Sequence, residues 1–496
     1  MPVSSPTHWC PGNPSAWIVS VPAPLDLESL ASRLAADAPE LIWLDSARQH
    51  AQSGRYSVLA WDPWLRFESR DGASRLQTSD GPRDLHGNPL DLLRSVLAAY
   101  APLVGESVPP VGIGLIGVVG YEAGRWIERL PRPKPAPLAV PELLLFGMRL
   151  AVVVDHAAGM SWCVSVADPH VSDARAADDA RRRLDELLAS IGSAIASDAS
   201  ADDAVEPADM QSLTSQAEFE RMVGAAKELI NAGDIFQANL SQAFVGCYHG
   251  STWSLYRTLR RINPSPFACF LSTPTISMAS CSPERLVRMR DGVVSTRPIA
   301  GTRPRGRRPD DDLLESLELI LSDKERAEHI MLVDLERNDL GRVCRAGSVL
   351  VDELMTLEEY SHVIHLVSNV EGRLRDGADA VDVLRAVFPG GTITGCPKVR
   401  AMEVISDLEP VGRGWYTGSC GMFGFDGTMD LNILIRTIVR RGEDVAFHVG
   451  AGIVADSQPE REYRETLAKA GALLAALGAP TTPSTTVTGH MSAETR

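Results

Sequence analysis

Apolar residues recur at helical spacing in several segments of the second half of the chain. In the run that begins at Ser215 and ends at Gly233, the apolar face contains Phe219, Val223, Ala226 and Ile230. Ser215 and Glu218 have the spacing of a capping box, in which each side chain bonds the backbone N–H of the other residue. The same signature occurs at Ser322…Glu325 and at Ser457…Glu460. The pattern therefore predicts amphipathic helices that begin near residues 215, 322 and 457.

Continuously apolar or alternating runs predict strands in both halves of the chain. They include residues 150–155 (LAVVVD), 163–168 (CVSVAD) and 429–440 (MDLNILIRTIVR), the last expected as one long strand before a turn at 441–444. Asp291-Gly292 separates two further runs, which favours a type I′ hairpin turn. Helices and strands do not alternate as in βαβ units, so the expected class is α+β.

Composition and charge narrow the classes of function. The 496 residues include 64 acidic and 48 basic ones, a net charge of −16, which argues against a general nucleic-acid binder. The most apolar stretch, 138–155, is interrupted by Pro141, Glu142 and Arg149 and is short for a membrane span. The N-terminus lacks a signal-peptide core, and the eight cysteines form no CxxC pair. We expect a cytoplasmic protein without disulfides or structural zinc.

Two polar segments suggest how the chain is divided. Residues 191–212 are rich in small and acidic residues and are expected to form a flexible linker, and 479–496 a disordered tail. The expected organisation is thus an N-terminal region (1–190), the linker, a motif-dense catalytic domain (213–478) and the tail. Both halves could contribute strands to one layered core.

Carboxylates at helical spacing are candidate metal ligands. Glu462, Glu465 and Lys469 form a stripe beside the apolar face of Tyr463, Leu467, Ala470, Leu474 and Leu477. Glu328 shares a face with Met331, Leu332 and Leu335, where a desolvated carboxylate needs a partner. One interpretation is a solvated helix face and a side chain that reaches water. The other is a Mg²⁺ site formed by the three carboxylates.

Two glycine-rich stretches and four single residues are further candidates. The stretch 389–398 (PGGTITGCPK) places Pro397 at the start of a helix, where backbone N–H groups favour an anion. The stretch 450–452 follows a strand and is either a ligand contact or a simple bulge. The single residues are Glu284, His365, Tyr416 and Arg436, the last expected to pair with an acid or an anionic ligand.

Taken together and in this order, the motifs resemble those of the chorismate-utilising enzyme family. They are SPERLV, RPIAGTRPRG, KERAEHIMLVDLERNDLGRV, HLVSNVEGRL, FPGGTITGCPKVRAMEVI, MDLNILIRT and GAGIVADSQPEREYRETLAKA, with GLIGVVGYEAGR at 114–125 resembling the N-terminal region. The resemblance covers 213–475 densely. It implies two packed β-sheets that form a layered core with helices outside.

The resemblance also implies roles for individual residues. Mg²⁺ would be held by Glu328, Glu462 and Glu465, Glu284 would be the general acid that protonates the departing C4 hydroxyl of chorismate, and His365 would lie beside the substrate. The positions expected around the two substrate carboxylates are Thr394, Tyr416, Arg436, Gly450, Ala451, Gly452 and Lys469.

The branch of the family is indicated by Gln237, at the position where members that add water carry a lysine base. Ammonia is therefore the expected nucleophile, supplied by a separate glutamine amidotransferase subunit. Asn239, Gly418-Ser419 and WLDSAR (43–48) resemble the branch that forms 4-amino-4-deoxychorismate for p-aminobenzoate and folate. The alternatives are the branch that forms anthranilate and pyruvate, and a catalytically silent binding subunit.

Two residues depart from the family pattern. Ala300 occupies the position where some aminodeoxychorismate-forming members have a nucleophilic lysine, so we expect ammonia itself to attack C2. Cys396 replaces the usual alanine of the TGAPK motif and is expected to be a small packed thiol.

Overall fold

The computed structural model describes residues 8–9, 16–48, 53–101, 113–171, 173–193, 207–304, 309–359 and 363–480. Its helices and strands form an α+β structure, which confirms the fold class predicted from the sequence. The strands of the described ranges pair in antiparallel fashion and join into one hydrogen-bonded network of 23 strands. The layers of the core are therefore continuous through backbone hydrogen bonds.

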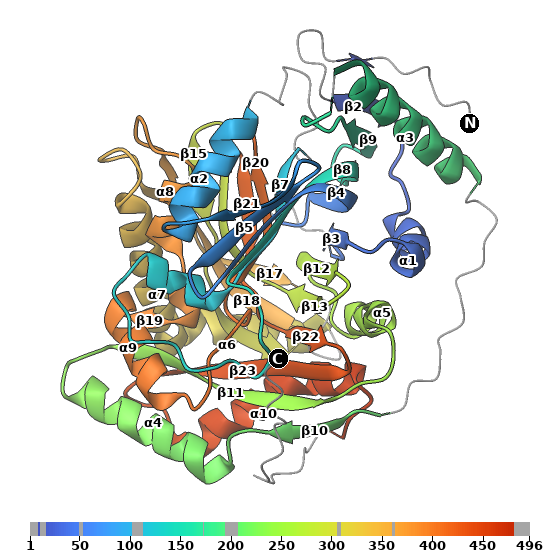
Figure 1. The fold of residues 1–496 in the computed structure, drawn as a ribbon. Helices are drawn as coiled ribbons and strands as arrows, with labels where there is room; N and C mark the ends of the chain where they lie inside the picture. Colours follow the sequence, from blue (N-terminus) through green and yellow to red (C-terminus); the bar gives the residue numbers. More distant parts are fainter. Residues whose placement is uncertain are drawn as a thin grey trace.

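The helices cover the outside of the strands (Figure 1). They are α1 (Leu27–Asp37), α2 (Pro89–Tyr100), α3 (Asp173–Ser193), α4 (Gln216–Asn231), α5 (Thr252–Ile262), α6 (Pro309–Leu321), α7 (Asp323–Gly341), α8 (Ala380–Val387), α9 (Lys398–Leu408) and α10 (Pro459–Ala476), with short 3₁₀ turns η2 (Tyr121–Trp126) and η4 (Gly391–Ile393). No described helix is both long enough and apolar enough to cross a membrane.

The strands come from both halves of the chain. Those of the first half are β1 (His8–Trp9), β2 (Ala16–Val21), β3 (Leu41–Asp45), β4 (Tyr56–Arg70), β5 (Ala73–Thr78), β6 (Gly81–Leu85), β7 (Gly114–Val119), β8 (Leu143–Asp155) and β9 (Met160–Val166). Those of the second half are β10 (Asp209–Ser212), β11 (Gln237–Cys247), β12 (Phe267–Ser272), β13 (Ser277–Ser282), β14 (Arg285–Arg290), β15 (Val293–Thr296), β16 (Ile299–Pro304), β17 (Leu350–Glu359), β18 (Val363–Arg373), β19 (Gly395–Cys396), β20 (Ser419–Gly424), β21 (Met429–Asn432), β22 (Thr437–Arg441) and β23 (Asp444–Ile453).

Strand pairs link the two halves directly. β3 pairs with β12, and β7 pairs with β20. The sheet therefore contains strands from either side of the expected linker. The end of that linker is itself ordered, because β10 pairs with β11. Residues 194–206 of the linker and 481–496 of the tail lie outside the described residues.

Side chains on opposite faces of the sheet enter two separate hydrophobic clusters. Along β3, Ile42 packs in one cluster, and Leu41 and Trp43 pack in the other. This follows from the alternation of side chains along a strand. Helices α2 and α8 contribute to the first cluster, and α1, α3, α5 and α10 to the second. In Figure 1 the two sets lie on different sides of the strands, with α1, α3 and α5 on the right and α2 and α8 on the left.

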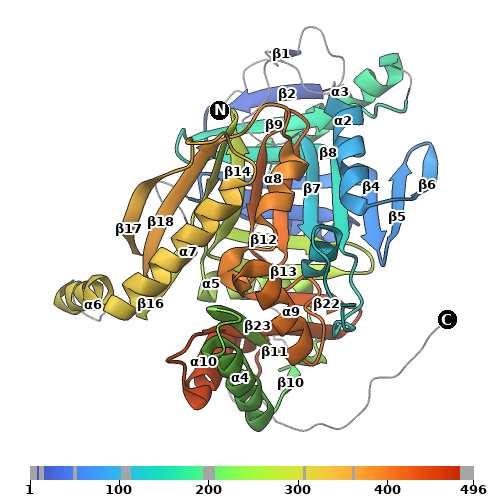
Figure 2. The same ribbon diagram turned by 90° about the vertical axis from the view of Figure 1, so that its left-hand side faces the viewer.

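The elements that later form the site meet at one end of the sheet. β11 and β23 pair along ten residues each, and α4 and α10 pack beside them (Figure 2). β18 pairs with β16 and with β17, and α7 packs against β18. Strands from the middle and the end of the chain thus surround a space that α7 and α10 border.

Several local predictions are tested by the backbone. The hairpin turn at Asp291-Gly292 is confirmed, because both residues have the positive φ of a type I′ turn, 52° and 70°. The capping box of Ser215 is confirmed, and Ser322 caps α7 through the N–H of Glu325. The predicted cap at Ser457 is wrong: α10 begins at Pro459, and the Ser457 hydroxyl accepts a hydrogen bond from the N–H of Val454.

The prediction of one long strand at 429–440 is also wrong. The segment divides into β21 and β22, and the four residues between them leave the sheet. Arg436 at the end of this break has a positive φ of 53°. Because of this break, Arg436 does not belong to either strand, and its side chain does not follow the alternation of a continuous strand.

Candidate active site

A cavity of about 830 Å³ lies among β11, β16, β18, β23, α7 and α10. It is lined by eight of the residues that the sequence predicted for the site: Gln237, Glu328, His365, Arg436, Gly452, Glu462, Glu465 and Lys469. These residues are separated by up to 232 positions in the chain, and the fold brings them to one space. The convergence makes this cavity the candidate active site.

Glutamates of two helices form the acidic wall of the cavity. Glu325 and Glu328 lie one turn apart on α7, and Glu462 and Glu465 lie one turn apart on α10. Sequence reasoning missed Glu325 as a site residue and assigned it to a helix cap. Its i, i+3 spacing from Glu328 repeats that of Glu462 and Glu465, and this repetition is the signal that could have found it.

The acidic wall has the donor chemistry that suits Mg²⁺. Carboxylate oxygens are hard ligands, and Mg²⁺ binds through one or two carboxylates together with water and substrate oxygens. In the described ranges, no three His, Cys, Asp or Glu side chains converge tightly enough to form a complete metal site by themselves. Glu465 is engaged in an ion pair, with Lys469 Nζ 2.7 Å from its Oε1. The residues fit an ion that shares its coordination with a bound anion.

Arg436 provides positive charge in the same cavity. Its Nη1 donates to Asn263 Oδ1 at 3.0 Å, and no ion pair with a carboxylate is formed within the part of the chain that the structure describes. Burial lowers the pKa of Arg436, while Cys281 and Glu284 act in the opposite direction. A buried guanidinium held by a neutral amide favours an anionic ligand.

Glu284 adjoins residues that line the cavity and has only 6% of its surface exposed. Burial raises its pKa from the ordinary 4.5 to about 7, against the lowering effects of the Thr392 hydroxyl, the Ile299 backbone and Arg436. Ile299, Thr392 and Arg436 line the cavity, although Glu284 is not among the lining residues. Its carboxyl group is thus protonated over much of the neutral range and can donate a proton.

His365, on β18, is neutral at physiological pH. Burial lowers its pKa to about 4, and the charge of Arg436 acts in the same direction. The imidazole therefore contributes no positive charge to the cavity. It can still donate or accept one hydrogen bond toward a ligand.

Besides Glu284, four predicted residues do not line the cavity. Thr394 is buried, and its Oγ1 donates to the Gly390 carbonyl at 2.8 Å, so that Thr392 faces the cavity instead. Ala451 packs in a hydrophobic cluster. Tyr416 is buried and stacks on His448, with ring centroids 5.1 Å apart.

Close packing accounts for the glycine at position 450, which does not line the cavity. A Cβ atom there would lie 2.7 Å from Asn239 Oδ1, 2.8 Å from Tyr416 Oη and 2.9 Å from the Leu240 carbonyl oxygen. The Gly450 carbonyl accepts a hydrogen bond from Lys469 Nζ at 2.9 Å. Of the stretch 450–452, only Gly452 lines the cavity.

The stretch 389–398, which the sequence suggested as an anion-binding loop, contributes only Thr392 to the cavity lining. Pro397 is the N-cap of α9, and Lys398 is the first residue of the helix. Lys398 Nζ lies 2.5 Å from Asp339 Oδ2 and donates to the Val387 carbonyl at 2.8 Å, so its charge is used inside the fold. The described cysteines are free thiols, and Cys10 lies outside the described residues.

The chain matches a known family over most of its length. The sequence profile of the chorismate binding enzymes matches residues 40–475, and the chain belongs to this family. It is a chorismate-utilising enzyme.

Its relatives include two kinds of enzyme. It is 40% identical to an aminodeoxychorismate synthase component 1 of Bacillus subtilis, over 90% of this chain and 93% of that one. It is 39% identical to an anthranilate synthase component 1 of Synechocystis, over 93% and 95%. Among solved structures, anthranilate synthase component I of Streptococcus pneumoniae superposes with a TM-score of 0.75 at 32% identity, covering 86% of this chain and 94% of that one.

Proposed function

We propose that the protein is an aminodeoxychorismate synthase component I, which aminates chorismate with ammonia in a Mg²⁺-dependent reaction. The observation that carries the proposal is the cavity itself: an acidic wall and the guanidinium of Arg436 border one space, with Gln237 where a water-activating lysine would stand. This combination suits a dicarboxylate that binds partly through a cation and partly through an arginine. It also lacks the basic side chain that would deprotonate water.

In the proposed reaction, Arg436 binds one substrate carboxylate and Glu284 protonates the oxygen that leaves C4. Mg²⁺, when bound to Glu328, Glu462 and Glu465, would neutralise the ring carboxylate and stabilise the charge that develops during departure. Ammonia adds at C2, both ring double bonds shift, and water leaves from C4. A second ammonia then adds at C4 as the C2 amine leaves, so the net change is chorismate and ammonia to 4-amino-4-deoxychorismate and water.

The residues that line the cavity favour free ammonia as the nucleophile. Ala300 lines the cavity and has no amine, so no lysyl adduct can form through this position. Gln237 and Asn239, both from β11, present amide groups that can hydrogen-bond ammonia without protonating it. His365, which is neutral at physiological pH, can hydrogen-bond the substrate. We further propose that a glutamine amidotransferase subunit supplies the ammonia, as the relatives' designation as component 1 suggests.

Anthranilate synthase is the second candidate. It is favoured by the similar identity to the Synechocystis enzyme and by the likeness to the Streptococcus pneumoniae structure. We prefer the first candidate because Asn239, which resembles the aminodeoxychorismate branch, lines the cavity. A second sign is Asp45 in WLDSAR, which is buried and accepts hydrogen bonds from Tyr256 Oη at 2.9 Å and Arg260 Nε at 2.5 Å.

The position of the incorporated nitrogen separates the candidates. Purified protein is incubated with chorismate, Mg²⁺ and ¹⁵N-labelled ammonium, and the product is examined by NMR. We expect the label on C4 of a non-aromatic product that retains its enolpyruvyl group. A label on C2 of an aromatic ring, with pyruvate released, would contradict the proposal and support the second candidate.

A further inference from the structure

Arg413 is almost completely buried, with 3% of its surface exposed, and every N–H group of its guanidinium has an acceptor. Nε and Nη2 donate to the two carboxylate oxygens of Glu409, at 3.0 and 2.7 Å. Nη2 also donates to the Asn239 carbonyl at 2.6 Å. Nη1 donates to the Ile393 carbonyl at 3.0 Å and to Thr417 Oγ1 at 3.2 Å. One side chain thus joins its own stretch, 409–417, to β11 and to the η4 turn.

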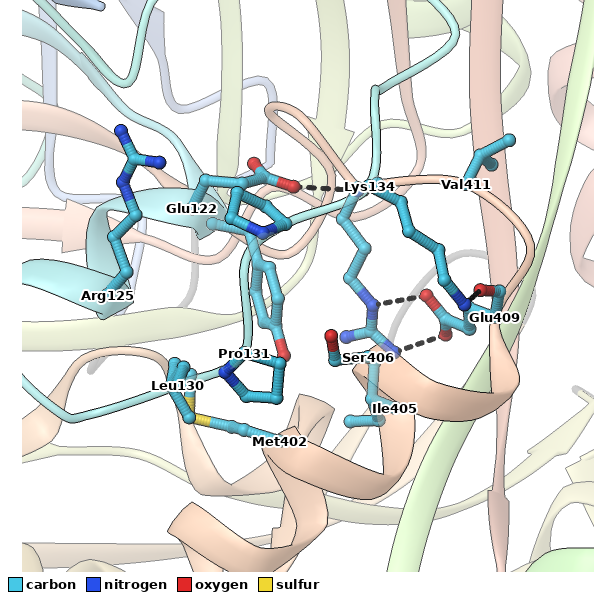
Figure 3. Close-up of a pocket in the computed structure, with 14 residues that line it drawn as sticks. Glu122, Arg125, Leu130, Pro131, Lys134, Met402, Ile405, Ser406, Glu409 and Val411 are labelled. Atoms are coloured by element: carbon cyan, nitrogen blue, oxygen red, sulfur yellow. Dashed lines mark hydrogen bonds and ion pairs between the residues drawn. The ribbon is translucent and has the colours of Figure 1, made fainter. Parts of the chain in front are cut away.

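The partner carboxylate is tied to the sheet as well. Glu409 Oε1 accepts hydrogen bonds from the N–H and the hydroxyl of Ser241 on β11, both at 2.8 Å. The guanidinium also lies over two aromatic rings, 4.8 Å from the centroid of Tyr121 and 5.6 Å from that of Tyr416. Figure 3 shows Glu409 and the Lys134 side chain on one side of a small pocket that Arg413 also lines, with Arg125 on the opposite side. The charges of Arg413 and Glu409 are therefore compensated on all sides.

Arg413 does not itself line the active-site cavity, but two of the backbone groups that it holds belong to the cavity wall or adjoin it. Asn239 lines the cavity, and Ile393 follows Thr392, which lines it and interacts with Glu284. The Asn239 N–H also donates to the Thr394 carbonyl at 2.8 Å, and Arg413 reinforces this contact because its rigid planar group binds β11 and the η4 turn together.

We propose that Arg413 is a positioning residue for the reaction, which holds Asn239 and Thr392 in register in the wall of the substrate cavity. The inference rests on the proposed function only in that chorismate is the substrate of this cavity. Lysine cannot replace arginine in this role, because an ammonium has three donors on a flexible stem, whereas the guanidinium offers five in a fixed plane.

The test compares Arg413→Lys with Arg149→Lys as a matched control. Arg149 also pairs with a buried carboxylate, that of Asp168 at 2.7 Å, but it lies outside the active-site cavity. Chorismate consumption is measured under saturating ammonium, together with thermal unfolding of both variants. We expect kcat of Arg413→Lys to fall about 100-fold, the size of loss that a displacement of about 1 Å at a reacting centre can cause. KM for chorismate should change less than about three-fold, and the control should keep its kcat.

A milder variant keeps the inference testable if Arg413→Lys does not fold. Ser241→Ala removes one hydrogen bond to Glu409 and leaves Arg413 in place, and a loss of about five-fold in kcat is expected. Addition of guanidinium to Arg413→Ala should restore part of kcat, which a purely structural role would not produce.

Three results would overturn the inference: unchanged kcat in folded Arg413→Lys, equal losses of kcat in Arg413→Lys and Arg149→Lys, or unchanged kcat in Ser241→Ala. If the wild-type product is anthranilate, the proposed function fails. The ratio of kcat in Arg413→Lys to kcat in wild type, both measured as chorismate consumption, still decides the role of Arg413.

Discussion

Replacement of Glu284 by glutamine tests the electrostatics of the site through stability. The pKa of this carboxyl group is raised from 4.5 to about 7 in the folded protein, chiefly by burial. A carboxyl group whose pKa is higher in the folded than in the unfolded chain contributes stability that is fully present below pH 4.5 and is lost as pH rises through 7. Each unit of pKa difference is worth about 1.4 kcal/mol, so the loss is about 3 kcal/mol.

Glutamine has a similar shape and no charge, so Glu284→Gln escapes this loss. The free energy of unfolding of the variant, relative to wild type, is expected to rise by about 2 to 3 kcal/mol between pH 5 and pH 8.5. The groups that face Glu284 are Thr392, the Ile299 backbone, Arg436 and Glu336, whose own pKa is raised to about 8. The charge of Glu284 is one cause of the raised Glu336 pKa, so the difference between the proteins reports on Glu284 together with this coupling.

The assay is urea unfolding of both proteins at several pH values, followed by circular dichroism. Glu228→Gln, on the exposed surface of α4, serves as the control and should follow wild type at every pH. Turnover of chorismate by Glu284→Gln should be lost at all pH values, while chorismate still binds. Two unfolding profiles that run parallel within about 0.5 kcal/mol would refute the assignment of a raised pKa.

Three further predictions concern the metal, the nucleophile and the core. Glu328→Gln should raise the Mg²⁺ concentration for half-maximal activity at least ten-fold, measured by titration of the metal-free protein; an unchanged midpoint would remove Glu328 from the metal site. Gln237→Lys should lower amination and produce some hydroxylated product detectable by mass spectrometry; a product mixture identical to that of wild type would show that this position does not select the nucleophile. Phe244→Ala should cost about 3 to 5 kcal/mol in the free energy of unfolding, because the buried ring stacks on Phe447 at 4.9 Å; a loss below 1 kcal/mol would contradict that packing.

The sequence predicted well those features that depend on local periodicity. The apolar stripe of α10, including Ala470 and Leu474, is buried, and Glu462 and Glu465 face the cavity from the adjacent stripe. This worked because helical spacing alone fixes which residues share a face. The hairpin at Asp291-Gly292 succeeded for a similar reason, since positive φ is a local property of these two residues.

Features that depend on tertiary contacts could not be predicted in the same way. The apolar run before Arg436 has the pattern of a continuous strand, but the Ile433 N–H bonds the Glu284 carbonyl at 3.0 Å and the chain leaves the sheet there. The sequence predicted Thr394 through the family resemblance, whereas the conformation of the η4 turn makes Thr392 the residue that lines the cavity. The role of Arg413 was equally invisible, because its acceptors come from segments up to 174 residues away.

The central claim is that this cavity aminates chorismate at C4, and one coupled assay tests it most directly. Purified protein is supplied with chorismate, Mg²⁺ and a high concentration of ammonium at mildly alkaline pH, with and without added aminodeoxychorismate lyase. The account predicts p-aminobenzoate only when the lyase is present. Anthranilate formed without the lyase would contradict it and would assign the chain to the anthranilate-forming branch.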